Sequence, residues 1–393
     1  MKIAMIGQKG IPATYGGIER HVEEISRRLV ARGHEVTVYC RFHYTPLQAE
    51  HHGVKIVRLP SWNTKHLDTA THVAVSTLHA LGQGYDLVHY HALAPSAFAF
   101  LPRWFGARTV VTVHGLDWQR EKWGHVASWA LRQCEGPAVR FPDRTIVVSR
   151  TLQSYFRDHH HRETVYIPNG THLPQSRPPT RLEGFDIEPG KYVLFVGRLV
   201  PEKGAHYLIE AFQNIRGDLK LAVVGGMSFT EGYVAELRKQ QSDRIRMLDY
   251  VYGETLEELW SNAYLVVLPS TMEGLSIALL EALSHGRCAL VSDIPENMEV
   301  AADCAVSFRS KDIADLTSKL QALIDDPEEV RRYERLARAR IQEHYNWDRV
   351  VDRLEEVYRG LWPAKSTRLG SAAGVAKAGG ADARALSKRA SRW

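Results

Sequence analysis

The chain has 393 residues, of which 44% are hydrophobic and 24% are charged, so its composition is that of an ordinary globular protein. Because domains usually hold about 100–200 residues, this length predicts two or three domains. The four cysteines are widely spaced and form no CxxC pair, which is typical of reduced core residues in a cytoplasmic protein. No stretch of about 20 consecutive apolar residues is present, so the sequence predicts no membrane span.

The net charge of +5 is unevenly distributed along the chain. From Pro363 to Trp393 the formal charge is +6, which leaves the preceding residues near −1, so a basic groove for nucleic acid is not indicated. This tail is rich in Ala, Gly and Ser and is predicted to be disordered. Since each Lys or Arg near an anionic bilayer contributes about 1 kcal/mol, the tail is a candidate tether to the inner face of the membrane. A solvated tail without a binding role is the alternative.

The first half of the chain alternates short apolar runs with amphipathic segments such as Glu19–Ala31. The opening run Met1–Gly7 lacks the longer apolar core of a signal peptide and is typical of a first β-strand. Strands that alternate with helices predict a parallel sheet with right-handed crossovers. The predicted strands are Ile3–Gly7, Glu35–Cys40, Val54–Leu59, Asp86–His91, Thr109–His114, Arg144–Ser149 and Thr164–Pro168.

Residues 173–190 are rich in proline and are predicted to form a linker, after which the same rhythm restarts. The strands predicted after it are Tyr192–Gly197, Leu219–Gly225, Ile245–Asp249, Tyr264–Pro269, Cys288–Val291 and Ala305–Phe308, followed by helices Pro327–His344 and Trp347–Trp362. We therefore predict an α/β protein with two Rossmann-like, doubly wound parallel-sheet domains. Its predicted parts are domain 1–172, linker 173–190, domain 191–345, final helix 346–362 and tail 363–393.

Two carboxylates, Glu273 and Glu281, follow the predicted strand Tyr264–Pro269. The residues after Gly274 are helical in character, so Glu273 is expected at a strand-to-helix turn and Glu281 two turns further along. The N-terminus of a helix presents free N–H groups and a positive dipole end, which suits a phosphate. One carboxylate beside an anion site and a second one deeper in a cleft suit a sugar nucleotide, whose hydroxyls need acceptors around a central diphosphate. A solvated helix face and a turn carboxylate are the alternative for this pair.

Two other strand-to-helix turns have features that suit a diphosphate. Gly16 and Gly17 precede the first helix, where a backbone without Cβ lets phosphate oxygens approach N–H groups. Their spacing is not GxGxxG, so a dinucleotide fingerprint is absent. Arg198 and Lys203 follow the strand Tyr192–Gly197 and can converge on one diphosphate, the arginine as a flat fork and the lysine as a point charge. A long turn and two solvated cations are the alternatives.

Together these motifs resemble family 4 of the retaining glycosyltransferases over nearly the whole chain up to about Trp362. The resemblance implies a GT-B fold, in which an acceptor-side domain and a nucleotide-sugar-binding domain face a cleft and a last helix crosses back to the first domain. The opening segment Lys2–Glu19 also resembles a bacterial subgroup assigned as rhamnosyltransferases. One departure is the run Glu-Gly-Leu-Ser, where the family commonly has Glu-Gly-Phe-Gly. Leu275 and Ser276 keep the backbone amides but alter the shape of the pocket.

The resemblance also implies which residues act. Those that it places at the reaction centre are His114, Glu273, Arg198 and Lys203. Those that it places around the donor are Gly16, Gly17, Asn169, Arg198, Lys203, Gly274, Leu275, Ser276 and Glu281. In this interpretation the two cations hold the diphosphate, His114 and Glu273 orient the sugar, and Glu281 accepts from the ribose hydroxyls. A structural histidine and a structural turn are the alternatives for His114 and Asn169.

No Asp-x-Asp pair occurs in the sequence, which argues against a metal-bridged donor, and we predict no metal site and no cofactor. The runs His159–His161 and His89–His91 could suggest metal ligands. Neither has HExxH spacing or a companion carboxylate, so we interpret them as a solvated run and a strand end.

The sequence thus predicts a retaining, metal-independent glycosyltransferase. It would move a hexosyl or deoxyhexosyl unit, such as rhamnosyl, from a UDP-, dTDP- or GDP-linked donor to a glycan or lipid-linked acceptor in cell-surface polysaccharide biosynthesis. It would work in the cytoplasm, with the tail as a peripheral membrane contact. The alternatives are a sugar-nucleotide epimerase of the same fold and a non-catalytic sugar-nucleotide sensor. A nicotinamide dehydrogenase is disfavoured by the absent GxGxxG.

Overall fold

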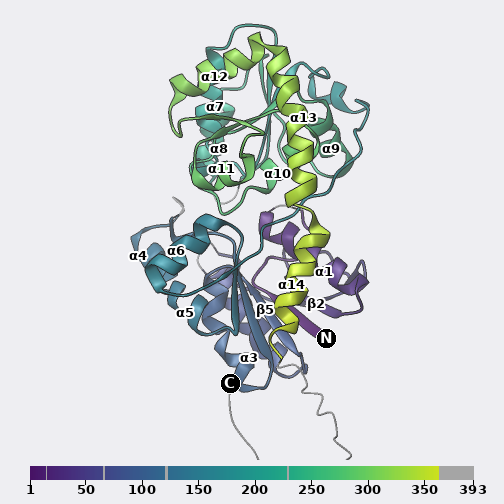
Figure 1. The fold of residues 1–393 in the computed structure, drawn as a ribbon, viewed down its shortest axis with the longest axis vertical. Helices are drawn as coiled ribbons and strands as arrows, with labels where there is room; N and C mark the ends of the chain where they lie inside the picture. Colours follow the sequence, from purple (N-terminus) through teal and green to yellow (C-terminus); the bar gives the residue numbers. More distant parts are fainter. Residues whose placement is uncertain (15, 65–66, 120–122, 228–229, 363–393) are drawn as a thin grey trace, which may run out of the picture. The chain divides into compact units, whose positions relative to one another are not determined.

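The computed structural model describes residues 1–14, 16–64, 67–119, 123–227 and 230–362 (Figure 1). The basic tail 363–393, predicted above as a disordered tether, lies outside the described residues. Within the described ranges, no helix is both long and apolar enough to cross a membrane.

The first half of the chain builds an eight-stranded sheet in the order β3-β4-β2-β1-β5-β6-β7-β8. All its pairings are parallel except that of β3 with β4. Because β2 lies on one side of β1 and β5 on the other, the winding of the chain reverses between β1 and β5. The strands are β1 (Lys2–Ile6), β2 (Glu35–Arg41), β3 (Glu50–His51), β4 (Val54–Leu59), β5 (Leu87–His91), β6 (Arg108–Val113), β7 (Arg144–Val147) and β8 (Val165–Tyr166).

The second half builds a six-stranded, wholly parallel sheet in the order β11-β10-β9-β12-β13-β14. Here the winding reverses between β9 and β12, which flank each other in the middle of the sheet. Its strands are β9 (Tyr192–Val196), β10 (Lys220–Val224), β11 (Ile245–Met247), β12 (Leu265–Leu268), β13 (Ala289–Ser292) and β14 (Val306–Phe308).

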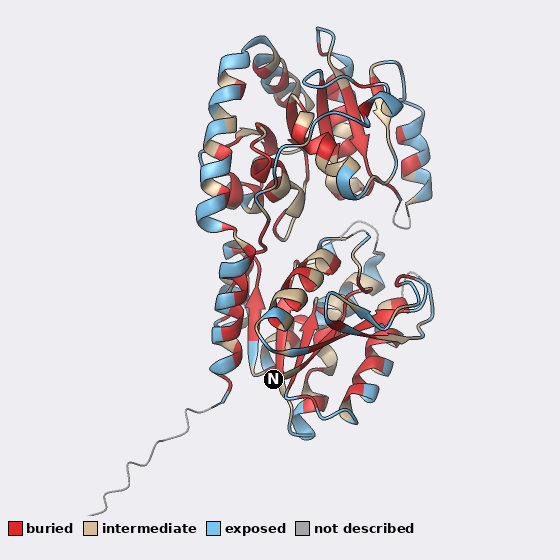
Figure 2. Cartoon of the chain, turned by 90° about the vertical axis from the view of Figure 1, so that its right-hand side faces the viewer, coloured by how far each residue is buried: buried red, intermediate tan, exposed pale blue. Residues whose placement is uncertain are grey.

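Helices connect the parallel strands of both sheets, and Figure 2 shows that the strands are mostly buried. Parallel strands covered on both faces must be apolar throughout, which is why these strands appear in the sequence as continuous apolar runs. In the first half the helices are α1 (Gly17–Ala31), α2 (Asp68–Leu81), α3 (Phe100–Trp104), α4 (His125–Gln133), α5 (Glu135–Arg140) and α6 (Arg150–His160). Those that follow are α7 (Ala205–Gln213), α8 (Glu231–Arg238), α9 (Gly253–Asn262), α10 (Ile277–Ser284), α11 (Pro295–Ala301), α12 (Ile313–Asp325), α13 (Pro327–His344) and α14 (Trp347–Arg359).

The last helix, α14, packs against the first half rather than the second (Figure 1). Its residues Trp347, Val351 and Tyr358 are buried in the same apolar cluster as Ile3 and Met5 of β1. The apolar stripe of this helix therefore completes the core of a domain whose first strand lies more than 300 residues earlier in the sequence. This is the returning helix of the predicted GT-B fold.

The predicted fold class is confirmed, and every predicted strand forms with small shifts at its ends. Strand β3 was not predicted, because two residues carry no periodicity. The predicted linker 173–190 also contains a short 3-10 helix, Leu182–Phe185, which forms where the apolar Leu182 is buried. The domain boundaries at residues 172 and 190 stay predictions.

Candidate active site

The two places where the winding reverses locate the candidate site. Ligands of doubly wound sheets bind beyond the carboxyl ends of the strands at such points. In the first sheet, β1 and β5 end there, so the loop with Gly16 and the side chain of His91 lie at this edge. In the second sheet, β9 and β12 end there and are followed by Arg198 and Glu273. The topology thus brings together residues that are far apart in the sequence.

Glu273 is held by two partners from its own half of the chain. The Nζ of Lys203 lies 2.5 Å from Oε1 of Glu273, and the hydroxyl of Ser270 donates to the same oxygen at 2.8 Å. The Glu273 side chain is only 7% exposed, so the ion pair is largely shielded from water. Gly204 fixes the turn after Lys203, because it has a φ of 71° and an added Cβ would lie 2.1 Å from the carbonyl oxygen of Pro269.

Gly274 brings the loop after β12 into contact with the first half. A Cβ at this position would lie 1.7 Å from the carbonyl oxygen of His114 and 3.3 Å from the Cα of Gly115. Only glycine allows so close an approach of two backbones. A Cβ added to Gly17 would likewise lie 3.3 Å from Cδ1 of Ile277. The predicted reaction-centre residue His114 and the predicted donor residue Gly274 are therefore in contact, and Gly17 lies against the first residue of α10.

Helix α10 begins at Ile277, later than the sequence indicated. Ser276 is its N-cap, and the Ser276 hydroxyl accepts from the N–H of Leu279 at 3.3 Å. Because a serine side chain satisfies one of the free amides at a helix start, the helix begins after it rather than after Gly274. Residues 274–276 were expected to be helical and are not, so Glu281 lies just beyond the first turn of this helix rather than two helical turns after Glu273.

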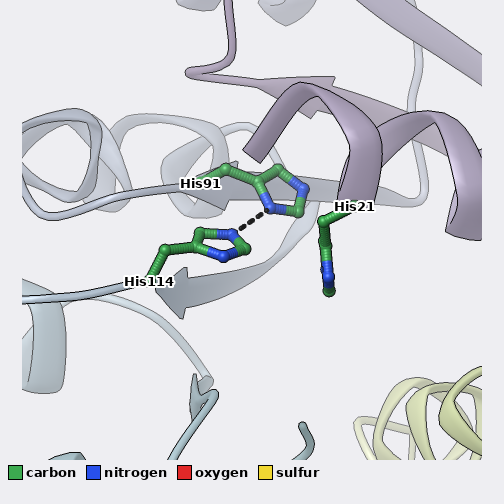
Figure 3. A group of neighbouring side chains, drawn as sticks. All are labelled: His21, His91 and His114. Carbon is green, nitrogen blue, oxygen red and sulfur yellow. Dashed lines mark hydrogen bonds between the residues drawn. The ribbon is translucent and has the colours of Figure 1, made fainter. Parts of the chain in front are cut away.

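Three histidines from three elements gather beside the contact with Gly274 (Figure 3). His21 belongs to α1, His91 ends β5 and His114 follows β6. Nδ1 of His91 and Nε2 of His114 form a hydrogen bond of 3.2 Å, and the ring of His21 lies edge-on to that of His114 at a centroid distance of 4.8 Å. One ring nitrogen from each of the three lies within 4.8 Å of the others, a spacing that could hold a metal ion.

The protonation state of His21 follows from its partner. Its Nδ1 lies 2.9 Å from Oδ1 of Asn169, whose Nδ2 donates to the carbonyl oxygen of Leu275 at 3.4 Å. Because an amide oxygen only accepts, Nδ1 of His21 carries the proton. Burial lowers the pKa of His21 to about 4, so the ring is neutral near pH 7 and its Nε2 offers a lone pair. The predicted donor residues Asn169 and Leu275 are thus linked to α1 by hydrogen bonds.

Burial also lowers the pKa of His89 and His91 well below the ordinary value. His89 lies between two hydroxyls, with Nδ1 at 2.7 Å from Tyr358 of α14 and Nε2 at 2.7 Å from Thr112. Nε2 of His91 is buried without a hydrogen-bond partner among the described residues. The interpretation of these histidines as a strand end is correct for their position, but it missed that His91 belongs to the site.

Glu281 and Glu24 differ in their electrostatic surroundings. Burial raises the pKa of Glu281, and the charges of Arg20 and His172 only partly offset this. Burial also acts against the charge of Glu24, but hydrogen bonds and ion pairs with His172 and neighbouring arginines outweigh it and hold the pKa of Glu24 well below its usual range. The Glu24 carboxylate lies 2.9 Å from His172 and 2.5 Å from Arg28. Glu24 is fully paired, whereas the ionised form of Glu281 is under-stabilised and suits a hydroxyl donor.

Arg198 lies in a backbone turn that is set by β10. The N–H of Leu199 donates to the carbonyl oxygen of Gly226 at 2.9 Å, and a Cβ on Gly225 would lie 1.8 Å from the carbonyl oxygen of Gly197. The charge of Arg198 adds to burial in lowering the pKa of Lys9, which follows β1. The charge of Arg198 is therefore felt by a lysine of the first half.

The run His159–His161 is only partly solvated, contrary to the prediction. Nε2 of His160 lies at hydrogen-bond distance, 2.8 Å, from Glu135, a buried carboxylate that also accepts from Trp118. The prediction failed because the companion carboxylate lies 25 residues earlier in the sequence. These contacts pack α5 against α6 and lie apart from the switch points.

Sequence reasoning missed His21, His91 and Ser270 as neighbours of the predicted site. For His21 a signal was available, because it lies on the buried face of α1 together with Val22 and Ile25. A histidine on an apolar helix face needs a hydrogen-bond partner, which here is Asn169. For Ser270, only the folded turn shows its proximity to the Glu273 carboxylate.

The sheets, the returning helix and the paired switch points define a GT-B fold, and solved structures share it. Sucrose-phosphate synthase from Thermosynechococcus elongatus matches with a TM-score of 0.79 and 23% identity, covering 92% of this chain and 98% of that one. Anabaena HepE (Alr3699), in complex with UDP and glucose, matches with a TM-score of 0.78 and 21% identity, covering 92% and 100%. At these identities the likeness shows the fold alone.

Two family models match consecutive parts of the chain. "Glycosyltransferase Family 4" matches residues 15–174, and "Glycosyl transferases group 1" matches residues 183–340. The chain is also similar to alpha-maltose-1-phosphate synthase of Mycobacterium tuberculosis. The two are 26% identical, and the match covers 91% of this chain and 99% of that protein. Together the two models cover most of the chain, which is therefore a GT4-type glycosyltransferase.

Proposed function

We propose that this glycosyltransferase is retaining and metal-independent, and that it transfers a hexosyl or deoxyhexosyl unit from a nucleoside diphosphate sugar to a glycan or lipid-linked hydroxyl. The observation that carries the proposal is the continuous arrangement of Lys203, Glu273, Gly274 and His114. It joins a cation for the diphosphate to a carboxylate and an imidazole for the sugar. Arg198 adds a second fixed cation, so the residues supply the positive charge that a metal supplies elsewhere.

The proposed reaction takes place on one face of the sugar. The bond between the anomeric carbon and the diphosphate oxygen breaks, and its electron pair stays on that oxygen. The acceptor hydroxyl attacks the same face of the carbon and gives its proton to the departing oxygen. Arg198, Lys203 and the amides before α10 stabilise the negative charge that develops there. Glu273 and His114 orient the sugar, and Glu281 accepts from the ribose.

The pairing of Lys203 with Glu273 suggests how donor binding changes the site. Without a donor, the ammonium neutralises the carboxylate at 2.5 Å. When a diphosphate binds, its two negative charges compete with the Glu273 carboxylate for the hydrogen bonds that the Lys203 ammonium donates. The Glu273 carboxylate then accepts from sugar hydroxyls instead. The two cations Lys203 and Arg198 then match the two negative charges of the diphosphate, and Glu273 keeps its charge beside the sugar hydroxyls.

The identity of the donor is the finer part of the proposal. UDP-linked sugars come first in a test panel, since the structurally similar Anabaena protein binds UDP and glucose, and dTDP- and GDP-linked sugars follow. Rhamnosyl transfer remains a candidate from the resemblance of the opening segment. A sugar-nucleotide epimerase would alter free donor without acceptor, and a sensor would bind donor without turnover.

The test is turnover with a panel of donors and glycan or lipid-linked acceptors after removal of metals with a chelator. We expect release of nucleoside diphosphate that depends on acceptor and continues at the same rate in the chelator. The product should keep the anomeric configuration of the donor, as read by NMR. Strict dependence on Mn²⁺ or Mg²⁺, inversion, or epimerisation of free donor would overturn the proposal.

We further propose a cytoplasmic role in cell-surface polysaccharide assembly, with the basic tail 363–393 in contact with anionic lipid at the inner face of the membrane. The tail's charge of +6 supports this, at about 1 kcal/mol for each cation near the surface. Co-sedimentation with anionic vesicles at low salt should fall sharply when the chain ends at Trp362. Equal binding of both chains would rule out the tail as the anchor.

A further inference from the structure

We infer that His21, His91 and His114 bind one transition-metal cation of the Zn²⁺ class, and that the bound cation inhibits sugar transfer. The binding stands on geometry alone. Only the inhibition rests on the proposed function, because it requires that His114 faces the reacting sugar. A metal that inhibits is compatible with turnover that needs no metal, since the same imidazole serves either the sugar or the cation.

The distances come close to those of a metal site. Zinc binds imidazole nitrogen at about 2.0–2.1 Å in a tetrahedron, which sets two such nitrogens about 3.3 Å apart. Nδ1 of His91 and Nε2 of His114 already lie 3.2 Å apart and share a hydrogen bond that a cation would replace (Figure 3). The ring nitrogens of all three histidines lie within 4.8 Å of one another. The widest of these gaps, at most 4.8 Å, has to close toward 3.3 Å when a cation binds.

The three ligands are anchored on separate, well-packed elements. His21 and His91 are buried, at 4% and 0% exposure, and are supplied by α1 and β5. Metal-bound histidines usually donate their second N–H to an acceptor, which fixes the tautomer. Nδ1–H of His21 does this toward Asn169 and leaves Nε2 as the ligand atom. A metal site therefore has one outer hydrogen bond in place before the cation arrives.

The chemistry of the three ligand atoms determines which metals can bind. Uncharged imidazole nitrogens suit Zn²⁺, Cu²⁺, Ni²⁺ and Co²⁺, whereas Mg²⁺ and Ca²⁺ prefer oxygen ligands. Three protein ligands leave one tetrahedral position for water or for an oxygen of a ligand. A cation here holds His114 through Nε2, so this imidazole can no longer serve the sugar. Donor and cation therefore compete, and inhibition should weaken as donor concentration rises.

The binding test uses the untagged, metal-stripped full chain without donor, with Zn²⁺ followed by calorimetry and Co²⁺ by its visible spectrum. We expect one site per chain with the intense absorption of four-coordinate cobalt. His21→Ala and His91→Ala should each weaken Zn²⁺ binding at least tenfold, and Asn169→Ala by about tenfold as an outer-shell change. The matched control is the double variant H51A/H52A, which removes another pair of neighbouring histidines, at a 4.3 Å centroid distance, and should bind as the native chain does.

Circular dichroism and the melting temperature confirm that each variant is folded, and His91→Asn replaces His91→Ala if that variant does not fold. Unchanged Zn²⁺ affinity in the His21 and His91 variants, or loss of the site in H51A/H52A, would overturn the inference. For inhibition, the rate of each protein is expressed as a fraction of its own metal-free rate. The Zn²⁺ concentration that halves this rate should be at least tenfold higher for His21→Ala than for the native chain. Tight binding without inhibition would overturn the inhibitory step and leave the site itself standing.

Discussion

The two halves of the molecule bring different chemistry to the same place. The first half supplies imidazoles, of which His21 and His91 are kept neutral by burial, which lowers the pKa of each ring. The second half supplies charges, as the ion pair of Lys203 with Glu273 and the guanidinium of Arg198. Sugar hydroxyls need hydrogen-bond partners without strong charge, whereas a departing diphosphate needs cations. In the proposed reaction, the second half therefore lowers the barrier electrostatically and the first half positions the sugar.

The largest effect should come from removing the cation of the second half. We expect Lys203→Ala to lower kcat by about 10²–10³-fold, the range found when one preorganised donor to a developing negative charge is lost. Glu273 then also lacks its neutralising partner at 2.5 Å. The measurement is steady-state turnover together with the melting temperature. Lys191→Ala, which removes an exposed lysine paired with Glu188, is the control and should leave kcat unchanged.

A folded Lys203→Ala enzyme with native turnover would contradict the division of labour between the halves. It would also remove the main support for catalysis without a metal. Restoration of the lost activity by Mg²⁺ would have a different meaning, because it would show that the site accepts an external cation in place of the ammonium.

The fold was largely predictable because its signal is local. Parallel strands such as β1 and β9 are continuous apolar runs, and the amphipathic stripe of α14 is visible in the sequence. The turns with Gly16, Arg198 and Glu273 could be placed because strand-to-helix junctions in such sheets line one edge. Each of these predictions depends on residues within one element or at its end.

The rest of the site depends on contacts between residues far apart in the sequence, and no local pattern identifies the partner of each residue. His21 and Asn169 are 148 positions apart and meet only because α1 and the segment after β8 lie at the same sheet edge. Likewise, His91 was interpreted as a strand end because its partner His114 follows a different strand. The early start assigned to α10 had a local cause, since the capping role of Ser276 was overlooked.

The contact between the halves at Gly274 should be the next most sensitive point. In Gly274→Ala the new methyl would lie 1.7 Å from the carbonyl oxygen of His114, so the loop has to move away. A misplacement of about 1 Å at a reacting centre costs up to about 10²-fold in rate, and we expect a loss of at least tenfold in kcat/KM. Gly232→Ala in α8, where a Cβ meets nothing within 4 Å, is the matched control. Equal activity of the two variants would show that this contact does not position His114.

The two carboxylates of the second half should separate binding from turnover. Glu281→Gln removes a charged acceptor for the ribose, which is worth about 1.5–3 kcal/mol, so free nucleoside diphosphate should bind about tenfold more weakly or worse. Glu273→Gln should lower kcat with little change in that affinity, because the carboxylate faces the sugar. Calorimetry with nucleoside diphosphate and steady-state kinetics decide the matter. The reverse division would mean that the two roles are exchanged.

The smallest effect concerns stability and has opposite signs for two glutamates. Burial raises the pKa of Glu281 above its ordinary value of 4.5, so in the folded protein its ionised form is disfavoured. Its contribution to stability is present below the ordinary pKa and is lost as pH rises through the folded value. Glutamine does not ionise, so the Glu281→Gln variant does not lose free energy of unfolding as the pH rises. We therefore expect its melting temperature to exceed that of the native chain near pH 7 and to equal it near pH 4.

Glu24 provides the internal comparison for this last prediction. Its pKa is held well below 4.5 despite burial, so its contribution is present above the ordinary value and is lost as pH falls. Glu24→Gln should therefore lower the melting temperature near pH 7, and its difference from the native chain should shrink under acid. Melting curves of both variants across this pH range test the pair together. A destabilised Glu281→Gln variant at neutral pH would show that this carboxylate is satisfied in the free protein and is not reserved for a ligand.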